Sequence, residues 1–249
     1  MRLQGKVAIV TGGGSGFGAG IVRKFVAEGA QVLVADIQLA AAQTVAAEVG
    51  PQALALRVDV ANAADVKQMV DTAIERFGRL DILINNAGVT HLPQALEDVS
   101  EADFDRIVAV NMKAIYLAAR VVVPRFKARQ RGVILNMAST AGVSPRPRLS
   151  WYNASKGAVN VLSKSMAAEL GAEGIRVNAV CPVMGATNLI EQFLGAADTP
   201  EARARVIAGI PLGRMSTPED VAEATLYLAS DAAAFITGIE LPVDGGRTI

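Results

Sequence analysis

Short aliphatic runs recur along the chain, and each has the length of one β-strand. They span positions 7–10, 31–35, 53–58, 82–84, 133–137, 175–180 and 239–243. Between most of them, apolar residues return at the spacing of an amphipathic helix. One such set is Phe17, Ile21, Val22, Phe25 and Val26, and a second is Val66, Met69, Val70, Ala73, Ile74 and Phe77. The alternation predicts repeated strand–helix–strand units.

The runs are almost continuously apolar, which fits parallel strands buried on both faces of a sheet. Right-handed crossovers then place helices on both sides. The pattern predicts an α/β fold with a doubly wound, seven-stranded parallel sheet, and a length of 249 residues suits a single domain over 1–249. The least regular stretch, 182–218, is expected to be a substrate loop with one or two short helices.

Composition narrows the class of protein. No apolar run of about 18 residues is free of charged or turn residues, so no membrane span is expected. The first strand follows the N-terminus too closely for an export signal. One cysteine, Cys181, and one histidine, His91, supply neither a disulfide framework nor a zinc ligand set. Because 24 basic residues balance 24 acidic ones, neither nucleic acid nor an anionic membrane is expected as a partner. We expect a cytoplasmic protein without a metal.

A glycine-rich loop, Thr11-Gly12-Gly13-Gly14-Ser15-Gly16-Phe17-Gly18, follows the first predicted strand and leads directly into a helix. Glycines allow a tight turn and close approach to a pyrophosphate, and a helix N-terminus offers unpaired N–H groups and a favourable dipole. A glycine cluster alone can be merely a turn. Its place between strand and helix favours a dinucleotide site.

Asp36 ends the second predicted strand, 18 residues after Gly18, close to the spacing of about 20 expected for an acid that binds the adenosine ribose. A carboxylate there accepts hydrogen bonds from ribose hydroxyls and repels a 2′-phosphate, and neither Ala35 nor Ile37 is an arginine. The pattern predicts NAD(H) rather than NADP(H). Asp59 and Val60 are expected to flank the adenine. Alternatively, Asp36 and Asp59 only cap helices.

Tyr152 and Lys156 are four residues apart at the start of a predicted helix, on one face. An ammonium within about 4–6 Å lowers the pKa of a phenol, normally about 10, so the pair is expected to exchange a proton with an alcohol or carbonyl oxygen. By itself such a pair is more often solvated helix surface. Ser139 adds a hydroxyl at the carboxyl end of a strand, where ligands gather.

In this order along the chain, these motifs resemble those of the short-chain dehydrogenase/reductase superfamily, in the branch whose chains have about this length. The similarity covers essentially the whole sequence. Its motifs are Thr11 to Gly18, Asn85-Asn86-Ala87-Gly88, Asn111, Ser139, Tyr152 with Lys156, Pro182 to Thr187, and Val243-Asp244-Gly245-Gly246.

The resemblance implies a Rossmann fold in which Asn111, Ser139, Tyr152 and Lys156 form a catalytic tetrad. Tyr152 would act as the acid and base, and Ser139 would orient the substrate oxygen. Lys156 would also bind the nicotinamide ribose, and Asn111 would position a water that links Lys156 to solvent. From the residues alone, Asn111 could equally mend a kink in a helix.

The resemblance also implies a set of NAD contacts, with Asn86, Ala87 and Gly88 beneath the cofactor and Thr187 at the carboxamide. The expected cofactor residues are Gly12, Ser15, Gly16, Phe17, Gly18, Asp36, Ile37, Asp59, Val60, Asn86, Ala87, Gly88, Tyr152, Lys156, Pro182, Val183 and Thr187. One position departs from the family, which usually has Pro-Gly where this chain has Pro182-Val183. The added side chain puts the substrate's shape in doubt, not the reaction class.

We therefore expect an NAD-dependent oxidoreductase that interconverts a secondary alcohol and a ketone, and the resemblance implies a homotetramer. The alternatives are a 3-oxoacyl-thioester reductase and, on the same fold, a non-catalytic nucleotide-sensing protein. The substrate pocket should be bounded by 91–94, 142–150 and 184–209. Arg146 and Arg148 invite an acidic substrate, although arginines in loops more often face solvent.

Overall fold

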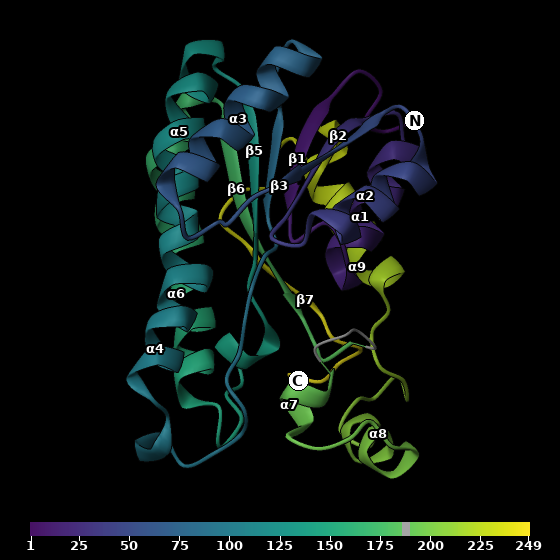
Figure 1. The fold of residues 1–249 in the computed structure, drawn as a ribbon, viewed down its shortest axis with the longest axis vertical. Helices are drawn as coiled ribbons and strands as arrows, with labels where there is room; N and C mark the ends of the chain where they lie inside the picture. Colours follow the sequence, from purple (N-terminus) through teal and green to yellow (C-terminus); the bar gives the residue numbers. More distant parts are fainter. Residues whose placement is uncertain (186–189) are drawn as a thin grey trace.

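A seven-stranded parallel sheet forms the centre of the computed structural model, which describes residues 1–185 and 190–249 (Figure 1). The strands are β1 (Val7–Thr11), β2 (Gln31–Asp36), β3 (Ala53–Arg57), β4 (Ile82–Asn85), β5 (Gly132–Met137), β6 (Ile175–Pro182) and β7 (Glu240–Val243). Their order is β3-β2-β1-β4-β5-β6-β7. All seven predicted strands are confirmed, with ends shifted by at most two residues.

Helices cover both faces of the sheet. One face carries α3 (Ala63–Phe77), α5 (Ala114–Arg129) and α6 (Ser150–Leu170), and the other carries α1 (Gly16–Ala27), α2 (Leu39–Val49) and α9 (Pro218–Ala229) (Figure 1). Each face has its own apolar core, with Met69 and Phe126 on the first and Phe25 and Leu226 on the second. The predicted doubly wound architecture is confirmed. Because the strand order turns around between β1 and β4, the connections diverge there and leave a crevice at the carboxyl ends of the strands.

In the described part of the stretch between β6 and α9 the chain forms two short helices, α7 (Ile190–Leu194) and α8 (Pro200–Ile207), as the sequence predicts. They lie with the C-terminus at one end of the molecule (Figure 1). Four single 3₁₀ turns occur elsewhere along the described chain: η1 (Leu96–Asp98), η3 (Thr140–Gly142), η4 (Gly171–Glu173) and η5 (Asp231–Ala233). The irregular stretch thus stands at the mouth of the crevice.

A continuous helical segment, Glu101–Arg129, runs through α4 (Glu101–Ile107), the π-helical turn η2 (Val108–Lys113) and α5. By length and composition it is apolar enough to cross a membrane, although no span was expected from the sequence, and 39% of its most apolar window is buried. The buried part includes Ile115, Val122 and Phe126 on the sheet. A core helix of a soluble protein passes the same test, so this segment is weak evidence for a span.

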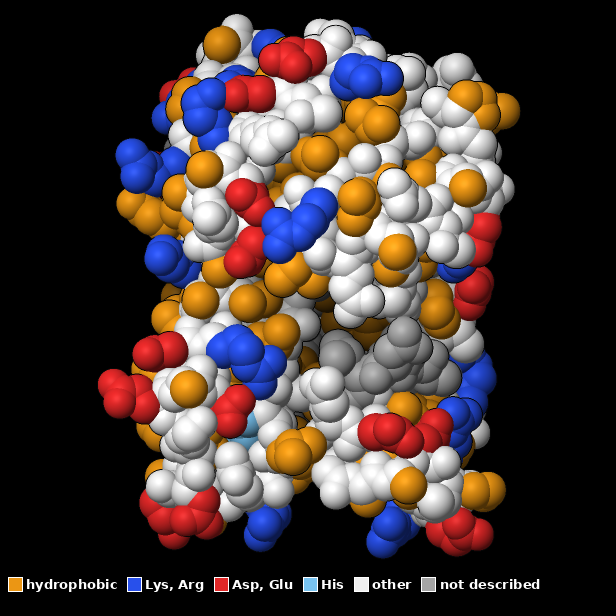
Figure 2. Space-filling model, in the orientation of Figure 1, with side chains coloured by type: hydrophobic (Ala, Val, Ile, Leu, Met, Phe, Trp, Pro, Cys, Tyr) orange, Lys and Arg blue, Asp and Glu red, His pale blue; other side chains and the backbone are white. Residues whose placement is uncertain are grey.

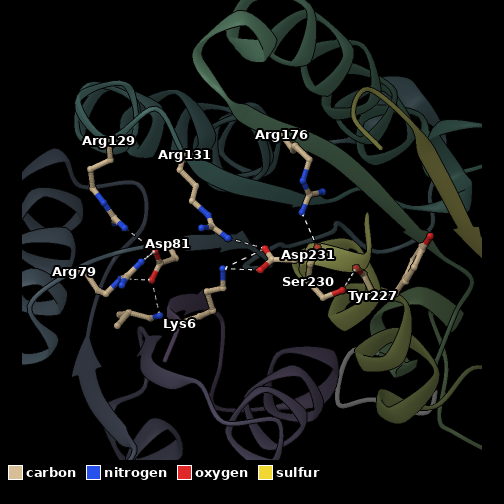
Figure 3. Close-up of polar contacts among 10 residues, drawn as sticks. Lys6, Arg79, Asp81, Arg129, Arg131, Arg176, Tyr227, Ser230 and Asp231 are labelled. Atoms are coloured by element: carbon tan, nitrogen blue, oxygen red, sulfur yellow. Dashed lines mark hydrogen bonds and ion pairs between the residues drawn. The ribbon is translucent and has the colours of Figure 1, made fainter. Parts of the chain in front are cut away.

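An ion-pair cluster, drawn in Figure 3, lies at the amino ends of β1 and β4, whereas the crevice lies at the carboxyl ends. The carboxylate of Asp81, just before β4, is 5% exposed and accepts hydrogen bonds from the Val7 backbone N–H at 2.9 Å and from Arg79 and Arg129. Burial raises the pKa of Asp81, but the hydrogen bonds from Arg79, Val7 and Arg129 outweigh it and hold the pKa below its usual value. The cluster therefore ties β1 and β4 to α5 through a charged carboxylate.

Asp81→Asn should lower the free energy of unfolding by about 1–3 kcal/mol at neutral pH, because the two arginines lose a charged acceptor. A carboxyl whose folded pKa is depressed contributes stability above its unfolded pKa, about 3.9, and loses it as the pH falls through the folded pKa. The difference from wild type in urea unfolding should therefore be smaller at about pH 3 than at about pH 7. As a control, Asp231→Asn removes a largely exposed carboxylate and should cost only about 0–1 kcal/mol. A loss of equal size at both pH values would contradict this account.

Candidate active site

A cavity of about 610 Å³ opens along the carboxyl ends of the strands, between the glycine loop and the start of α6. Figure 2 shows this face of the molecule hollowed at mid-height. Every predicted cofactor residue within 1–185 and 190–249 lines the cavity. Thr187, the remaining one, lies outside the described residues. The fold therefore brings together residues that are far apart in the sequence.

The glycine loop leaves the N-terminus of α1 open to the cavity. Ser15 is the N-cap but its side chain makes no capping hydrogen bond, and the first turn contains no acidic residue. The N–H groups and positive end of the helix dipole are therefore available to an anion. Gly12 has a φ of +63°, and a Cβ on Gly18 would collide with the carbonyl oxygen of Gly12. The sequence folds this way because glycine alone fits both positions.

The segment after β4 is fastened to this loop. The Thr11 hydroxyl accepts hydrogen bonds from the N–H groups of Asn86 and Ala87, at 3.0 and 3.1 Å. The Asn86 amide donates in turn to the carbonyl oxygens of Thr11 and Gly12, at 2.8 and 3.1 Å. These bonds place Asn86, Ala87 and Gly88 beside the glycine loop on the cavity wall.

Asp36 ends β2 and faces the same loop. Its Oδ2 accepts a hydrogen bond from Gly14 N at 3.0 Å, and Oδ1 accepts one from Gln38 N at 2.9 Å. The N-cap of α2 is Gln38, so Asp36 is not the cap of that helix. The carboxylate lies partly exposed on the cavity wall, where it can accept further hydrogen bonds.

Asp59 and Val60 also line the cavity, in the loop after β3, which ends at Arg57 rather than at 58 as predicted. Asp59 Oδ1 accepts a hydrogen bond from Ala61 N at 2.9 Å. The alternative that Asp59 caps a helix is wrong, because Asn62 caps α3 by accepting from Ala64 N and Asp65 N.

Ser139, Tyr152 and Lys156 converge at the other end of the cavity. Ser139 follows β5, and its Oγ accepts a hydrogen bond from Ala141 N at 3.1 Å. Tyr152 lies in the first turn of α6 and is only 7% exposed. Lys156 Nζ donates to the carbonyl oxygen of Met137 at 2.8 Å and lies 5.8 Å from the centre of the Tyr152 ring.

The ionisation of this pair differs from the sequence prediction. Burial raises the pKa of Tyr152 to about 12, although the Ser139 hydroxyl and the Arg146 charge act to lower it. Burial also lowers the pKa of Lys156 to about 8. The predicted lowering of the Tyr152 pKa by Lys156 is therefore wrong in this cavity, because desolvation dominates and the amine binds the Met137 carbonyl. At neutral pH the phenol holds its proton.

Asn111 stands behind the cavity wall, in the π-helical turn η2, and is 2% exposed. Its amide donates to Val89 O and Ser155 Oγ, both at 3.0 Å, and accepts from Val89 N at 2.9 Å. Lys156 Nζ and Asn111 Oδ1 lie 3.3 and 3.5 Å from the place that a Cβ on Gly88 would take. Asn111 thus lies in an irregular turn of a helix, which fits the alternative that it mends a helix kink. It also lies near Lys156.

The substrate end of the cavity includes residues that sequence reasoning placed only loosely or missed. Phe193 of α7 packs edge-on against the Tyr152 ring, with centroids 5.1 Å apart. Arg146 lines the cavity, whereas Arg148 is exposed outside it. Arg247 was missed, although it follows a strand at the ligand-binding edge of the sheet, a rule that applies to β7 as to the others.

The structure shows whether His91 and Val183 line the cavity. His91 was expected to bound the pocket, but it is 2% exposed, does not line the cavity, and its Nδ1 lies 2.7 Å from Leu92 O. Val183 does line the cavity, and its N–H donates to Val243 O at 3.1 Å. The side chain that departs from the family pattern is therefore part of the wall.

The chain is similar to known dehydrogenases and reductases over its whole length. A family model described as enoyl-(acyl carrier protein) reductase matches residues 12–248. The 4-formylbenzenesulfonate dehydrogenase of Comamonas testosteroni is 47% identical, with 100% of both chains covered. The 2-(S)-hydroxypropyl-CoM dehydrogenase 3 of Xanthobacter autotrophicus is 40% identical, covering 99% of this chain and 98% of the relative.

A solved structure shares the fold closely. The crystal structure of 3-ketoacyl-(acyl-carrier-protein) reductase from Brucella melitensis complexed with NADH superposes with a TM-score of 0.95 at 46% identity, covering 99% of this chain and 100% of that one. With the match of the family model and of full-length relatives, the chain belongs to the short-chain dehydrogenase/reductase superfamily.

Proposed function

We propose that this protein is an NAD(H)-dependent oxidoreductase that interconverts a secondary alcohol and a ketone. One observation carries the proposal: a single cavity has an uncapped helix N-terminus and Asp36 at one end, and the buried Tyr152 with Ser139 and Lys156 at the other. The same observation argues against a non-catalytic nucleotide sensor, because such a protein needs no proton donor in its binding site.

The cavity fits a dinucleotide at each of its parts. The free N–H groups of α1 suit a pyrophosphate, and glycines keep that cradle open where side chains would fill it. Asp36 would bind the adenosine ribose, with Ile37, Asp59 and Val60 around the adenine. Asn86 to Gly88, Pro182 and Val183 would lie along the nicotinamide half, and Thr187 is proposed for its carboxamide. When bound, the nicotinamide supplies or accepts the hydride.

Tyr152 would then act as the general acid in reduction and the general base in oxidation. In reduction the carbonyl carbon gains a hydride and the carbonyl oxygen gains the phenolic proton, which leaves a tyrosinate. The Arg146 charge stabilises that anion, since it already acts to lower the pKa of Tyr152. Ser139 would hold the substrate oxygen toward the phenol. Lys156 would orient the nicotinamide ribose, and Asn111 would act through its position beside Lys156. Oxidation runs through the same groups in reverse.

Asp36→Asn should weaken the preference for NADH over NADPH by about tenfold or more, because the substitution removes the charge that repels a 2′-phosphate while keeping an acceptor for Gly14 N. The ratio of kcat/KM for the two cofactors, followed at 340 nm during ketone reduction, measures the effect. Asp105→Asn, on the exposed side of α4, is the control and should leave the ratio unchanged. If Asp36→Asn also left it unchanged, the carboxylate would not select the cofactor.

A 3-oxoacyl-thioester reductase is the second candidate, supported by the name of the Brucella melitensis relative. The same 340 nm assay with acetoacetyl-CoA and with simple aryl ketones separates the two functions. Turnover of the thioester alone would favour the second.

We also propose that residues 1–249 form one domain and assemble in the cytoplasm as a homotetramer. Tyr116 on α5 and Val161 on α6 are 54% and 65% exposed, and a contact with further subunits would cover such apolar side chains. Light scattering should give a mass near four chains, and a monomer mass would remove the assembly proposal.

A further inference from the structure

Among the described residues, the end of the cavity that holds Tyr152 is lined by two arginines and by no acidic side chain. Arg146 and Arg247 both line it, whereas the cavity's acidic residues, Asp36 and Asp59, lie with the loops at the carboxyl ends of β2 and β3. Neither arginine takes part in an ion pair among the residues of 1–185 and 190–249, and positions 186–189 contain no acidic residue. The substrate end therefore carries uncompensated positive charge.

Arg146 is held beside the phenol by its backbone. The amide of Asn153, the residue after Tyr152 on α6, donates to Arg146 O at 2.7 Å. The guanidinium is partly buried, and its pKa is lowered first by that burial and then by the charge of Arg247, while Tyr152 acts in the opposite direction. Arg146 is thus near both the proton donor and the second arginine.

Arg247 reaches the same place from the turn after β7. Asp244 fixes this turn by accepting hydrogen bonds from Gly246 N at 2.9 Å and from the N–H and hydroxyl of Thr248 at 3.0 and 2.7 Å. Those bonds occupy its carboxylate. The Arg247 side chain lies against Gly209, where an added Cβ would be 3.2 Å from Nε. The guanidinium is therefore positioned by the backbone turn and by the segment after α8, without an acidic partner.

Arg146 is half-buried and Arg247 is exposed at the cavity wall, and the charge of Arg247 acts against the ionised form of Arg146. An anion bound by both side chains would offset that repulsion. Carboxylates and sulfonates have the planar or forked oxygens that guanidinium groups bind. The lining of this cavity includes the apolar side chains of Leu149, Met184 and Phe193, together with the polar Ser144, Gln192 and Thr248. The cavity thus brings a proton donor, apolar side chains and two cationic side chains together.

We propose that the substrate bears a carboxylate or sulfonate on an apolar body remote from the reacting carbon, and that Arg146 and Arg247 bind this anion. The proposal rests on the proposed oxidoreductase function and specifies its substrate class. It separates these two side chains from Arg148, which lies on the same loop as Arg146 but outside the cavity.

A matched ketone series tests the proposal at pH 7, where Tyr152 is protonated with or without Arg146. The substrates are 4-acetylbenzoate and 4-acetylbenzenesulfonate, with the neutral 4-acetylbenzamide and the cationic 4-acetyl-N,N,N-trimethylanilinium as comparisons. Wild type should favour the anions over the amide by about tenfold or more in kcat/KM. Arg146→Gln and Arg247→Gln should each remove most of this preference through KM. In Arg247→Gln the amide should change by less than about twofold, because it makes no charge-assisted bond. Arg146→Gln also removes a charge that acts on Tyr152, so it should still lower kcat/KM more for the anions than for the amide.

Arg148→Gln is the matched control and should behave as wild type with every substrate. NADH affinity, measured by fluorescence titration, should stay unchanged in all three variants. An equal loss on anionic and neutral ketones, a wild-type preference for the amide, or a variant that weakens NADH instead of the anion would overturn the proposal.

Binding without turnover distinguishes this inference from the function on which it rests. Calorimetric titration of 4-acetylbenzoate into the NADH-saturated protein should show binding that Arg146→Gln weakens by about tenfold, while Arg148→Gln does not. If no ketone is reduced but this binding pattern holds, the proposed reaction fails and the anion site stands. If ketones are reduced and anions bind no more tightly than the amide, the anion site fails alone.

Discussion

Tyr152→Phe should lower turnover by about 10²–10⁴-fold, the contribution of a positioned acid or base, while the dissociation constant for NADH changes by less than about twofold. The substitution keeps the ring that packs against Phe193 and removes only the hydroxyl. Steady-state kinetics at 340 nm and NADH fluorescence titration measure the two quantities. Ser139→Ala leaves the phenol in place, so its turnover should fall by less than that of Tyr152→Phe. Wild-type turnover in Tyr152→Phe would show that another group supplies the proton.

The raised pKa of Tyr152 also fixes the pH dependence of the two directions. With a pKa of about 12, the phenol is the dominant form at neutral pH, so reduction needs no prior ionisation. Oxidation needs the tyrosinate. Below the pKa, the tyrosinate fraction grows about tenfold for each unit by which the pH rises. The oxidation rate should therefore climb from pH 7 toward alkaline pH, and Tyr152→Phe should lack this rise.

Gly18→Ala should raise the dissociation constant for NADH by about 100-fold, because an error of about 1 Å in a binding loop can cost that much. The new Cβ would collide with the Gly12 carbonyl oxygen and lie 2.6 Å from Asn86 Nδ2. Backbone atoms must then move, and the N–H groups at the start of α1 move with them. Fluorescence titration with NADH measures the change.

Gly171→Ala is the matched control for this loop. It is the same chemical change at a φ of −59°, and an added Cβ there has no heavy atom within 4 Å. NADH affinity should match wild type in this variant. If Gly18→Ala bound NADH as tightly as Gly171→Ala does, the glycine loop would not be the phosphate site.

The strands were predictable because central parallel strands are apolar on both faces, which leaves runs such as 133–137 without polar interruption. The interruption of the helix at 107–114 was not predictable from the sequence. The π-helical turn there depends on hydrogen bonds from Asn111 to Val89 and Ser155, partners 22 and 44 residues away. No local pattern encodes such contacts.

The site was predictable to the extent that its residues follow strands or form motifs, as Asp36 and Tyr152 do. The pKa of Tyr152 was not, because it depends on how completely the fold buries the ring against Phe193 and how far Lys156 Nζ lies from it. Arg247 belongs to no motif, and only the turn held by Asp244 brings it to the cavity.

The charge on Arg146 has a cost outside the active site. Burial and a neighbouring like charge both disfavour the ionised form of Arg146, and a group whose ionised form is disfavoured in the native state weakens the fold by the same linkage. The molecule thus gives up conformational stability at the place where it selects what to bind, a compromise typical of proteins that evolve just above the stability they need.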